Sequence, residues 1–233
     1  MPAVLRIVSV QKHYHGLRPL RMRGLTIASG ERVAISGLDA GAAEVLVNLV
    51  TGASLPDEGD VFVLEENTRA IADGDAWLAS LDRFGIVSPR AVLLDSATLL
   101  QNLAMPFTLQ IDPVPSDIAA RAARLAADSG IPETALPQPI AALAPDLRAR
   151  AHLARAVALD PALLVLEHPA AGLDRAASRA LAAHVARVTA ARDLATLVIS
   201  EDREFNRVAA QRRYALRGAT GELKPERLGF LRL

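Results

Sequence analysis

The chain has 233 residues, with 26 Lys and Arg, 26 Asp and Glu, and a formal net charge of zero. A chain of this length suits one α/β domain, or one domain with a small subdomain. Hydrophobic residues make up 51% and charged residues 22%, a composition that excludes wholesale disorder. The absence of cysteine excludes disulfides, thiol catalysis and cysteine-based zinc sites. The balanced charge leaves no global basic field for a nucleic acid or an anionic membrane surface.

No run of about 18 uncharged apolar residues occurs, so we expect no membrane-spanning segment. Near the start of the chain, Arg6, Lys12 and His13 interrupt the apolar stretch that a secretory signal peptide needs. We therefore expect the protein to be made and kept in the cytoplasm.

Short apolar runs alternate with helical patterns along the chain. Residues 31–37 are a β-branched run that stops at Gly37, and a helical pattern follows at 42–50. Together they predict a strand–turn–helix unit. The other predicted strands are 4–10, 25–28, 61–64, 84–88, 163–167, 194–200 and, as the last, 213–218.

The middle of the chain, about 93–145, has a helical pattern punctuated by prolines. We expect a helical subdomain there, inserted in the core of a single domain that spans 1–233. Further helices are predicted at 146–160, 175–193 and 204–211. Alternation of strands and helices predicts a mostly parallel sheet with helices on both faces.

Four stretches carry a resemblance to a known family: 35–63, 93–107, 147–174 and 194–218. The most specific is LARAVALDPALLVLEHPAAGLD, within the third stretch. The order of these segments resembles the ATP-binding subunit of ABC transporters, over about residues 4–220. The resemblance implies an α/β, P-loop NTPase-like fold with an N-terminal antiparallel β part. It also implies ATP hydrolysis coupled to transport, with Mg-ATP as cofactor.

The phosphate loop of this family has the pattern GxxxxGK[ST], in which lysine and the hydroxyl bind the phosphates and Mg²⁺. The matching segment keeps glycines but has alanine at the lysine position and glutamate at the hydroxyl position. Each added carboxylate at ~5 Å from a phosphate costs about 3 kcal/mol at an effective dielectric constant of ~20. A simple strand–helix turn therefore explains the segment better than a phosphate site does. The remnant of the nucleotide site comprises Tyr14, Gly37, Asp39, Gly41, Ala42, Ala43 and Glu44.

The other motif positions are altered as well. The resemblance places Glu167 and His168 at the Asp-Glu pair of the Walker B strand, Pro89 at the Q-loop glutamine and Glu201 at the H-loop histidine. His168 is expected to be structural or interfacial, since nothing nearby would place a γ-phosphate beside it. No catalytic position is intact, and no metal site is expected. The remnant of the signature LSGGQ is Leu143, Ala144, Pro145, Asp146 and Leu147.

Some features of the family survive. Tyr14 stands where the family has an adenine-stacking aromatic, although an isolated tyrosine near a strand end is as often a packing residue. The D-loop, which in the family makes contacts across a dimer, keeps Gly172, Leu173 and Asp174.

These observations predict a catalytically degenerate subunit that resembles an ATP-binding domain. It would be a pseudo-ATPase with weak or absent ATP binding, and no cofactor is predicted for it. Its expected partners are a second ATP-binding subunit, in a homo- or heterodimer, and a membrane permease. The permease would dock on the surface around Pro89 to Phe107 and on the helical subdomain. That places it on the cytoplasmic face of the membrane, as a peripheral structural or regulatory subunit. No nucleic acid partner is expected.

Two alternatives remain open. The first is a weak ATPase that uses Glu167 and His168, with phosphate contacts from arginines such as Arg23 or Arg90. The second is a soluble interaction module derived from this fold. If the protein is a weak ATPase, Mg-ATP is its cofactor.

Overall fold

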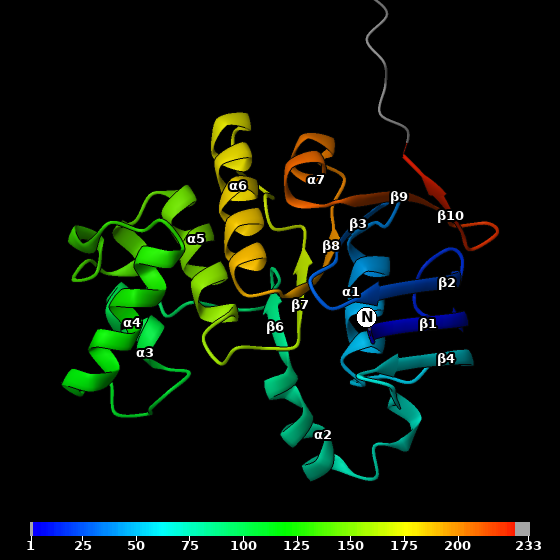
Figure 1. The fold of residues 1–233 in the computed structure, drawn as a ribbon, viewed down its shortest axis with the longest axis horizontal. Helices are drawn as coiled ribbons and strands as arrows, with labels where there is room; N and C mark the ends of the chain where they lie inside the picture. Colours follow the sequence, from blue (N-terminus) through cyan, green and yellow to red (C-terminus); the bar gives the residue numbers. More distant parts are fainter. Residues whose placement is uncertain (1, 227–233) are drawn as a thin grey trace, which may run out of the picture.

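We describe residues 2–226 of a computed structural model of the chain. Two sheets and a group of helices make up the fold (Figure 1). The strands are β1 (Ala3–Lys12), β2 (Leu20–Ala28), β3 (Arg32–Ser36), β4 (Glu58–Val63), β5 (Glu66–Asn67), β6 (Phe84–Val87), β7 (Leu163–Glu167), β8 (Ala195–Ile199), β9 (Arg212–Arg217) and β10 (Glu222–Pro225). The α-helices are α1 (Ala40–Val50), α2 (Gly74–Ser80), α3 (Leu99–Ala104), α4 (Ser116–Asp128), α5 (Pro145–Ala156), α6 (Arg175–Ala191) and α7 (Arg203–Ala209). Short 3₁₀ turns occur at Thr68–Ala70, Leu81–Arg83, Glu133–Ala135 and Ile140–Ala142.

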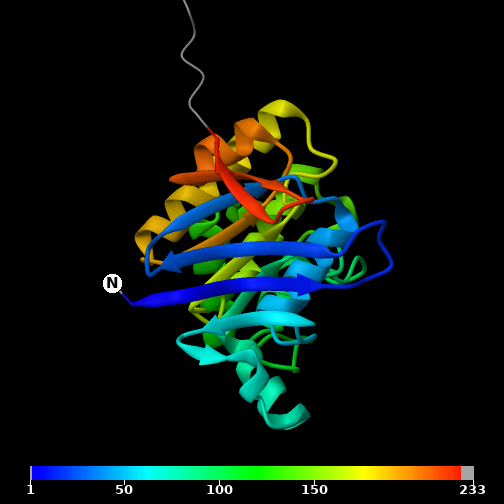
Figure 2. The same ribbon diagram turned by 90° about the vertical axis from the view of Figure 1, so that its right-hand side faces the viewer.

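The larger sheet has the strand order β10-β9-β3-β8-β7-β6. Its strands are parallel except for β10, which runs antiparallel to β9. The smaller sheet, β2-β1-β4-β5, is antiparallel and formed by the N-terminal part of the chain, as Figure 2 shows. The predicted fold class, a mostly parallel sheet with helices on both faces and an N-terminal antiparallel part, is confirmed.

The larger sheet is buried on both faces because its central strands are apolar at almost every position. In β7 all residues from Leu163 to Glu167 are buried, and in β8 the same holds from Ala195 to Ile199. Such continuous apolar runs are typical of parallel strands covered by helices. Alternate residues of these strands belong to two different hydrophobic clusters, one on each face.

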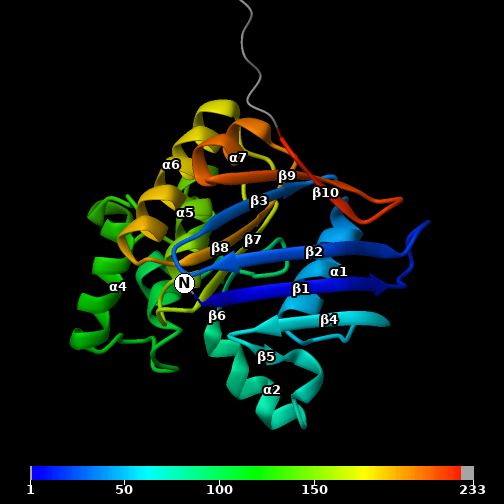
Figure 3. The ribbon, with the colours of Figure 1, turned by 45° about the vertical axis from the view of Figure 1, so that its right-hand side comes forward.

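One cluster packs α1 between the antiparallel sheet and the larger sheet, whereas the other packs α3 to α7 against the opposite face. Figure 3 shows these two layers. Helices α3, α4 and α5 lie together at one end of the molecule (Figure 1). Because β3, β6, β7 and β8 run parallel, their carboxyl ends meet at one edge of the larger sheet. Many open α/β folds bind ligands at this edge.

The segment before α3 is fixed by the buried side chain of Asn102. Its amide donates to the backbone oxygens of Leu94 and Thr98, and its Oδ1 accepts from the N–H of Leu94 at 2.8 Å. Thr98 and Gln101 form a capping box at the start of α3. These contacts hold the segment after β6 against the helices.

The sequence-based prediction was wrong about the last strand. The strand at 213–218 corresponds to β9, but β10 follows it and forms the edge of the larger sheet. The pattern missed β10 because it is short and ends at a proline, which an edge strand tolerates and a central strand does not. Helix α2 was also missed because none of its residues is buried, so its sequence has no apolar face to detect.

Within residues 2–226, no helix is both long and apolar enough to cross a bilayer.

Candidate functional site

The turn between β3 and α1 occupies the position of the predicted phosphate loop. Gly37 has a φ of +87°, and a Cβ there would lie 2.6 Å from the backbone oxygen of Leu216 on β9, so only glycine fits. Helix α1 begins at Ala40, directly after Asp39, whose carboxylate caps it by accepting from the N–H of Ala42 at 2.8 Å. The turn is therefore short, running only from 37 to 39.

The position that aligns with the phosphate-binding lysine lies inside the helix. The side chain of Ala43 is fully buried in the core, and its N–H donates to the backbone oxygen of Asp39 at 2.8 Å. Ala42 is buried beside it. The backbone N–H groups of both residues already have partners within the cap and first turn of α1.

The N–H groups at the start of the turn bind a carboxylate from the neighbouring strand. Glu201 follows the end of β8, which pairs with β3. Its Oε1 accepts from the N–H of Gly37 at 2.6 Å and from the N–H of Leu38 at 3.1 Å. Hydrogen bonds to an ionised acceptor are about twice as strong as neutral ones. Glu201 thus accepts from both N–H groups at the start of this turn.

A guanidinium lies between two acidic side chains at the same edge. Both terminal nitrogens of Arg90 contact the carboxylate of Glu167, with Nη1–Oε1 at 3.2 Å and Nη2–Oε2 at 2.9 Å. Nη1 also lies 3.4 Å from Oε2 of Glu44 on α1. Glu167 is only 2% exposed, whereas Arg90 and Glu44 are about half exposed. The cluster joins the ends of β6 and β7 to the first turns of α1.

His168 follows Glu167 and has a left-handed backbone with a φ of +45°. Its N–H donates to the backbone oxygen of Ile199 on β8 at 2.8 Å. Its ring Nε2 is buried and has no hydrogen-bond partner among the described residues. Pro89 is exposed and lies just before Arg90.

A second carboxylate reaches the turn from the C-terminal edge strand. Oε1 of Glu226 accepts from Oγ of Ser36, the last residue of β3, at 2.8 Å. The sequence analysis missed Glu226, and no pattern in the sequence connects it with β3. In the part of the chain that the structure describes, no group of three or more His, Asp or Glu side chains is placed to hold a metal ion.

Tyr14 lies beside the start of α1. A Cβ placed on Gly41 would be 3.4 Å from the ring of Tyr14, so the ring covers the first turn of the helix. Partial burial, and then the negative charge of Asp39, raise the pKa of the Tyr14 hydroxyl above its ordinary value. Tyr14 also packs against the core that contains α1.

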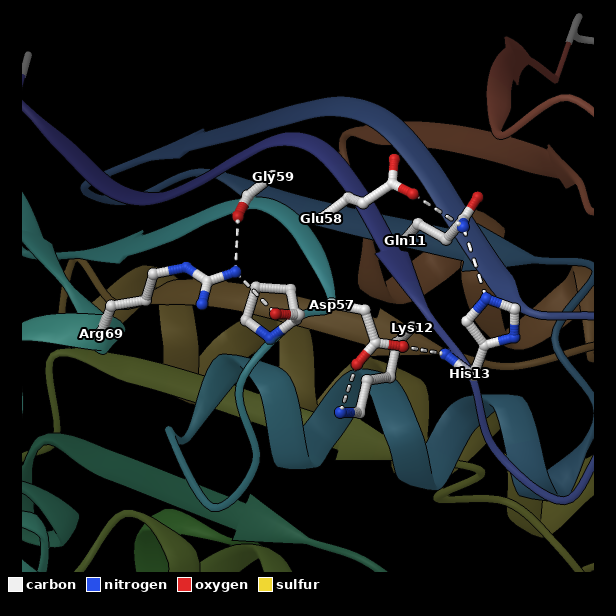
Figure 4. A network of polar contacts seen from close by, with 8 residues as sticks. Gln11, Lys12, His13, Asp57, Glu58, Gly59 and Arg69 are labelled. Carbon is white, nitrogen blue, oxygen red and sulfur yellow. Dashed lines mark hydrogen bonds and ion pairs between the residues drawn. The ribbon is translucent and has the colours of Figure 1, made fainter.

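A polar network fixes the end of β1 close to Tyr14 (Figure 4). The carboxylate of Asp57 accepts from Nζ of Lys12 at 2.9 Å and from the N–H of His13 at 2.6 Å. Arg69 donates to the backbone oxygens of Pro56 and Gly59, on either side of Asp57 in the chain. The backbone hydrogen bond from His13 and the bond from Lys12 lower the pKa of Asp57. The network sets the direction in which the chain leaves β1 toward Tyr14.

The fold of the whole chain is similar to that of solved structures. The chain aligns with a dimeric ATP-binding cassette, MJ0796, bound to ADP and Pi, over 97% of its length and all of that chain, with a TM-score of 0.77 and 21% identity. It aligns with cbiO1 of Clostridium perfringens, part of an ABC transporter complex, over 96% of its length and 88% of that chain, with a TM-score of 0.80 and 19% identity. The fold is that of an ATP-binding cassette.

Curated proteins extend the likeness to the sequence. A methionine import ATP-binding protein, MetN, of Mesorhizobium japonicum is 28% identical over 90% of this chain, which spans 56% of that protein. A lipoprotein-releasing system ATP-binding protein, LolD, of Alcanivorax borkumensis is 29% identical over 81% of this chain and 82% of its own length. No family model matches the chain. The relatives support the predicted resemblance to the ATP-binding subunits of ABC transporters.

The remaining positions matched to the cassette motifs have structural partners. In the signature remnant, Leu143 is buried, Ala144 and Pro145 begin α5, and Asp146 pairs with Arg150 one turn later. Leu147 packs against the same core. Proline at the first helical position leaves α5 with one N–H fewer at its N-terminus.

The D-loop of the cassette connects β7 to α6. Gly172 has a φ of +78°, and a Cβ placed on it would meet only open space, whereas Leu173 packs against the core. The carboxylate of Asp174 accepts from the N–H of Ala177 at 2.8 Å and so caps α6. Asp174 therefore has a local role that requires no second subunit.

The structure brings some predicted residues together and separates others. Gly37, Asp39, Glu44, Glu167 and Glu201 gather at one edge of the cassette, with Arg90 between two of them. Arg23, which the weak-ATPase alternative uses as a phosphate contact, lies on β2 and donates through Nε to the backbone oxygen of Thr220 at 3.0 Å.

Proposed function

We propose that this protein is a catalytically degenerate ATP-binding subunit of an ABC-type membrane transport complex, with a structural or regulatory role and weak or absent ATP binding. The observation that carries the proposal is the contact of Glu201 with the N–H groups of Gly37 and Leu38. A carboxylate of the chain itself takes the donors that the family uses for a phosphate.

The charges around the turn support the same proposal. Asp39, Glu44 and Glu201 face the position where a triphosphate would lie, and no lysine faces them from α1. A like charge at ~5 Å opposes a phosphate by about 3 kcal/mol at an effective dielectric constant of ~20. The favourable interaction with the start of a helix is only about 0.3–1 kcal/mol at an exposed site. Repulsion therefore outweighs the attraction.

The residues present do not fit Mg-ATP. Both oxygens of Glu167 are engaged by Arg90, and Glu44 stands at the position of the hydroxyl that would bind Mg²⁺. A metal ion at Glu167 would have to displace a guanidinium that already neutralises that buried carboxylate. This arrangement supports no hydrolytic step.

Calorimetry with Mg-ATP tests the proposal. At Mg-ATP concentrations up to about 100 μM, the native protein should give no saturable heat and no rise in melting temperature. A ligand at about 100 times its Kd would add roughly 2.7 kcal/mol, or about 5–10 °C for a chain of this size. Saturable binding with a Kd below about 100 μM would contradict the proposal and favour the alternative of an ATP-binding, ATP-hydrolysing subunit.

A matched variant shows whether these residues cause the expected loss of ATP binding. Replacing only Ala43 with lysine would bury a charge, because Ala43 is fully enclosed. The informative variant replaces the whole segment 37–44 by GASGAGKS and carries Glu201→His in addition. Binding by this variant but not by the native protein supports the proposal.

We also propose a second ATP-binding subunit and a membrane permease as partners. A related cassette is dimeric in its solved structure, and curated relatives carry the names of import or release systems. Exposed apolar side chains between Pro89 and Phe107, namely Val92 and Leu94, support permease docking beside the helices of the proposed subdomain at 93–145. The protein would then be peripheral, on the cytoplasmic face of the membrane.

Affinity purification from the detergent-extracted membrane fraction tests these partners. Recovery of a polytopic permease supports the transport role. Recovery of soluble partners alone contradicts it and favours the interaction-module alternative. A double substitution of Val92 and Leu94 by serine should reduce recovery of the permease. Leu78→Ser is the control, because this exposed leucine lies on α2, outside the proposed docking surface.

A further inference from the structure

A cavity lies beside α2, at the amino ends of the parallel strands. Its volume is about 420 Å³, within the range of about 300–1,000 Å³ that is usual for small-molecule pockets. Its walls include Thr51, which follows the end of α1, and Phe84, the first residue of β6. Figure 1 shows α2 next to the start of β6, away from the carboxyl end of that strand. The cavity is therefore separate from the edge that carries Glu167 and Glu201.

Helix α2 forms one wall of the cavity without packing tightly onto the rest of the protein. None of its seven residues is buried. A hydrogen bond from Nε1 of Trp77 to the backbone oxygen of Thr51, at 3.0 Å, fixes the helix against the end of α1. The wall formed by α2 and the segment before it has three small side chains that leave the space open: Ala70, Ala72 and Ala76. An unfilled space gives up dispersion contacts that a ligand would restore.

The uncharged polar side chains in the walls offer little to a ligand. The hydroxyls of Thr51 and Ser80 donate to backbone oxygens three or four residues earlier in the chain, at 3.0 and 2.7 Å. The amide of Asn67 donates to the carboxylate of Asp60 at 2.8 Å. The hydroxyl of Thr68 is buried, out of reach of a ligand. The accessible lining is therefore mainly apolar, with Val63, Ile71 and Phe84 beside the alanines.

The charges at the cavity are balanced. Among the described residues, two charged side chains line it, Arg83 and Glu66, and they form an ion pair with each other. Their side chains are 39% and 67% exposed, so the pair lies on the solvent side of the cavity. A charged ligand would lose hydration there without meeting an unpaired opposite charge. The cavity therefore favours an uncharged molecule.

We propose that this cavity binds a small, uncharged and mainly apolar molecule. Its apolar body lies against Val63, Ile71 and Phe84, and α2 covers it. The ligand displaces water that apolar walls hold poorly, which favours binding. The ion pair of Arg83 and Glu66 stays intact on the solvent side.

NMR of the full-length ¹⁵N-labelled protein tests the site through the indole N–H of Trp77. The chain has a single tryptophan, and its N–H donates to Thr51 in the cavity wall. Benzyl alcohol, benzoate and benzylammonium are the probes, because they share a phenyl ring and differ in charge. At about pH 7 and constant ionic strength, benzyl alcohol should shift the indole signal saturably with a Kd below about 5 mM. Each charged probe should bind about tenfold more weakly or worse, because its lost hydration is not compensated.

Ala76→Phe should weaken binding of benzyl alcohol by about tenfold or more, because the added ring fills part of the cavity. Ala79→Phe is the matched control, since Ala79 is exposed on the same helix and does not line the cavity. Its Kd should stay within about twofold of the native value. Both replaced side chains are exposed, so both variants should melt within about 2 °C of the native protein.

A Kd above about 5 mM for benzyl alcohol, a charged probe that binds as tightly, or unchanged binding by Ala76→Phe overturns the proposal. Occupancy of this cavity does not depend on whether ATP binds. Bound Mg-ATP would shift the backbone N–H signals of Gly37 and Leu38, at the other edge of the sheet, whereas benzyl alcohol shifts the indole signal of Trp77. Failure of one proposal is therefore distinguishable from failure of the other.

Discussion

Arg90 and Glu167 form a two-point contact between the ends of adjacent parallel strands, with nitrogen–oxygen distances of 3.2 and 2.9 Å. They are 77 residues apart in the chain. The carboxylate is 2% exposed, so it depends on the guanidinium for most of its neutralisation. The pair therefore joins the segments that follow β6 and β7 and neutralises the buried carboxylate.

Arg90→Ala should lower the free energy of unfolding by about 2–3 kcal/mol, because it leaves a buried carboxylate without a partner. Urea denaturation measures the change. The double variant Arg90→Ala/Glu167→Gln should recover more than half of the loss, since no buried charge remains. Glu44→Gln, which removes only a half-exposed ion pair, should change stability by less than about 1 kcal/mol. A loss of less than about 0.5 kcal/mol in Arg90→Ala would show that the contact is unimportant.

Glu201→Ala should lower the melting temperature by about 2–4 °C, because two N–H groups of the turn lose their charged acceptor. The backbone N–H signals of Gly37 and Leu38 should shift most in the NMR spectrum. Glu201→Gln is the control that keeps an acceptor oxygen, and its effect should be smaller. Equal melting temperatures for all three proteins would argue that Glu201 does not hold the turn.

His152 should make the protein less stable in mild acid. Its pKa is about 4 in the folded state, because of burial and then Arg155, against about 6.5 when unfolded. Below pH 6.5 the unfolded chain takes up a proton that the folded protein refuses until about pH 4, so stability falls across this window. Since the ring is partly exposed, solvent screening limits the loss to roughly 1–2 kcal/mol.

Urea titrations at pH values between those two limits measure this loss. His152→Gln should show a flatter dependence on pH than the native protein. His184, whose pKa is also lowered by burial and then by Arg150 and Arg187, contributes with the same sign. His184→Gln should therefore flatten the dependence on pH in the same direction. Identical slopes for the native protein and His152→Gln would be evidence against a neutral buried ring.

Asp202 links the start of α7 to α6. Its carboxylate accepts from the N–H groups of Glu204 and Phe205, at 3.0 Å each, and from Oγ of Ser178 at 2.6 Å. Asp202→Ala should cost about 1–2 kcal/mol in the free energy of unfolding, which is typical of a lost helix cap. Asp202→Asn should retain most of the cap, and Ser178→Ala should remove only the contact with α6.

The pH dependence of Asp202 has the same sign as that of His152, because the pKa of each group is lower in the folded protein and stability therefore falls in acid. Burial raises its pKa, but the hydrogen bonds from Ser178, Phe205 and Glu204 and the charge of Arg175 lower it by more, so the net direction is down. The stabilisation is present above the ordinary pKa and is lost as pH falls through the lowered value. Asp202→Asn should remove this acid-dependent part, so the variant should be less stable than the native protein near pH 7 and approach it as pH falls through the lowered pKa, as circular dichroism during acid titration would report.

The order of elements could be predicted because each depends on local pattern. The run LLVLE at 163–167 is apolar up to its final glutamate, and it forms β7 with those bounds. The glycine-terminated run before α1 also formed as expected, although the helix begins at Ala40 instead of Ala42 because Asp39 caps it. Elements without a buried face, such as α2, left no such pattern and were missed.

The chain by itself determined the type of fold and the identity of the residues at each motif position. Apolar periodicity decides which faces must be buried, and the residue type at each position that the resemblance assigns to a motif is visible without coordinates. Only the tertiary structure decided what these residues contact: Glu201 with Gly37, 164 positions apart, and Arg90 with Glu167. Parallel strands bring their carboxyl ends together whatever the length of chain between them, so these contacts leave no periodic trace in the sequence.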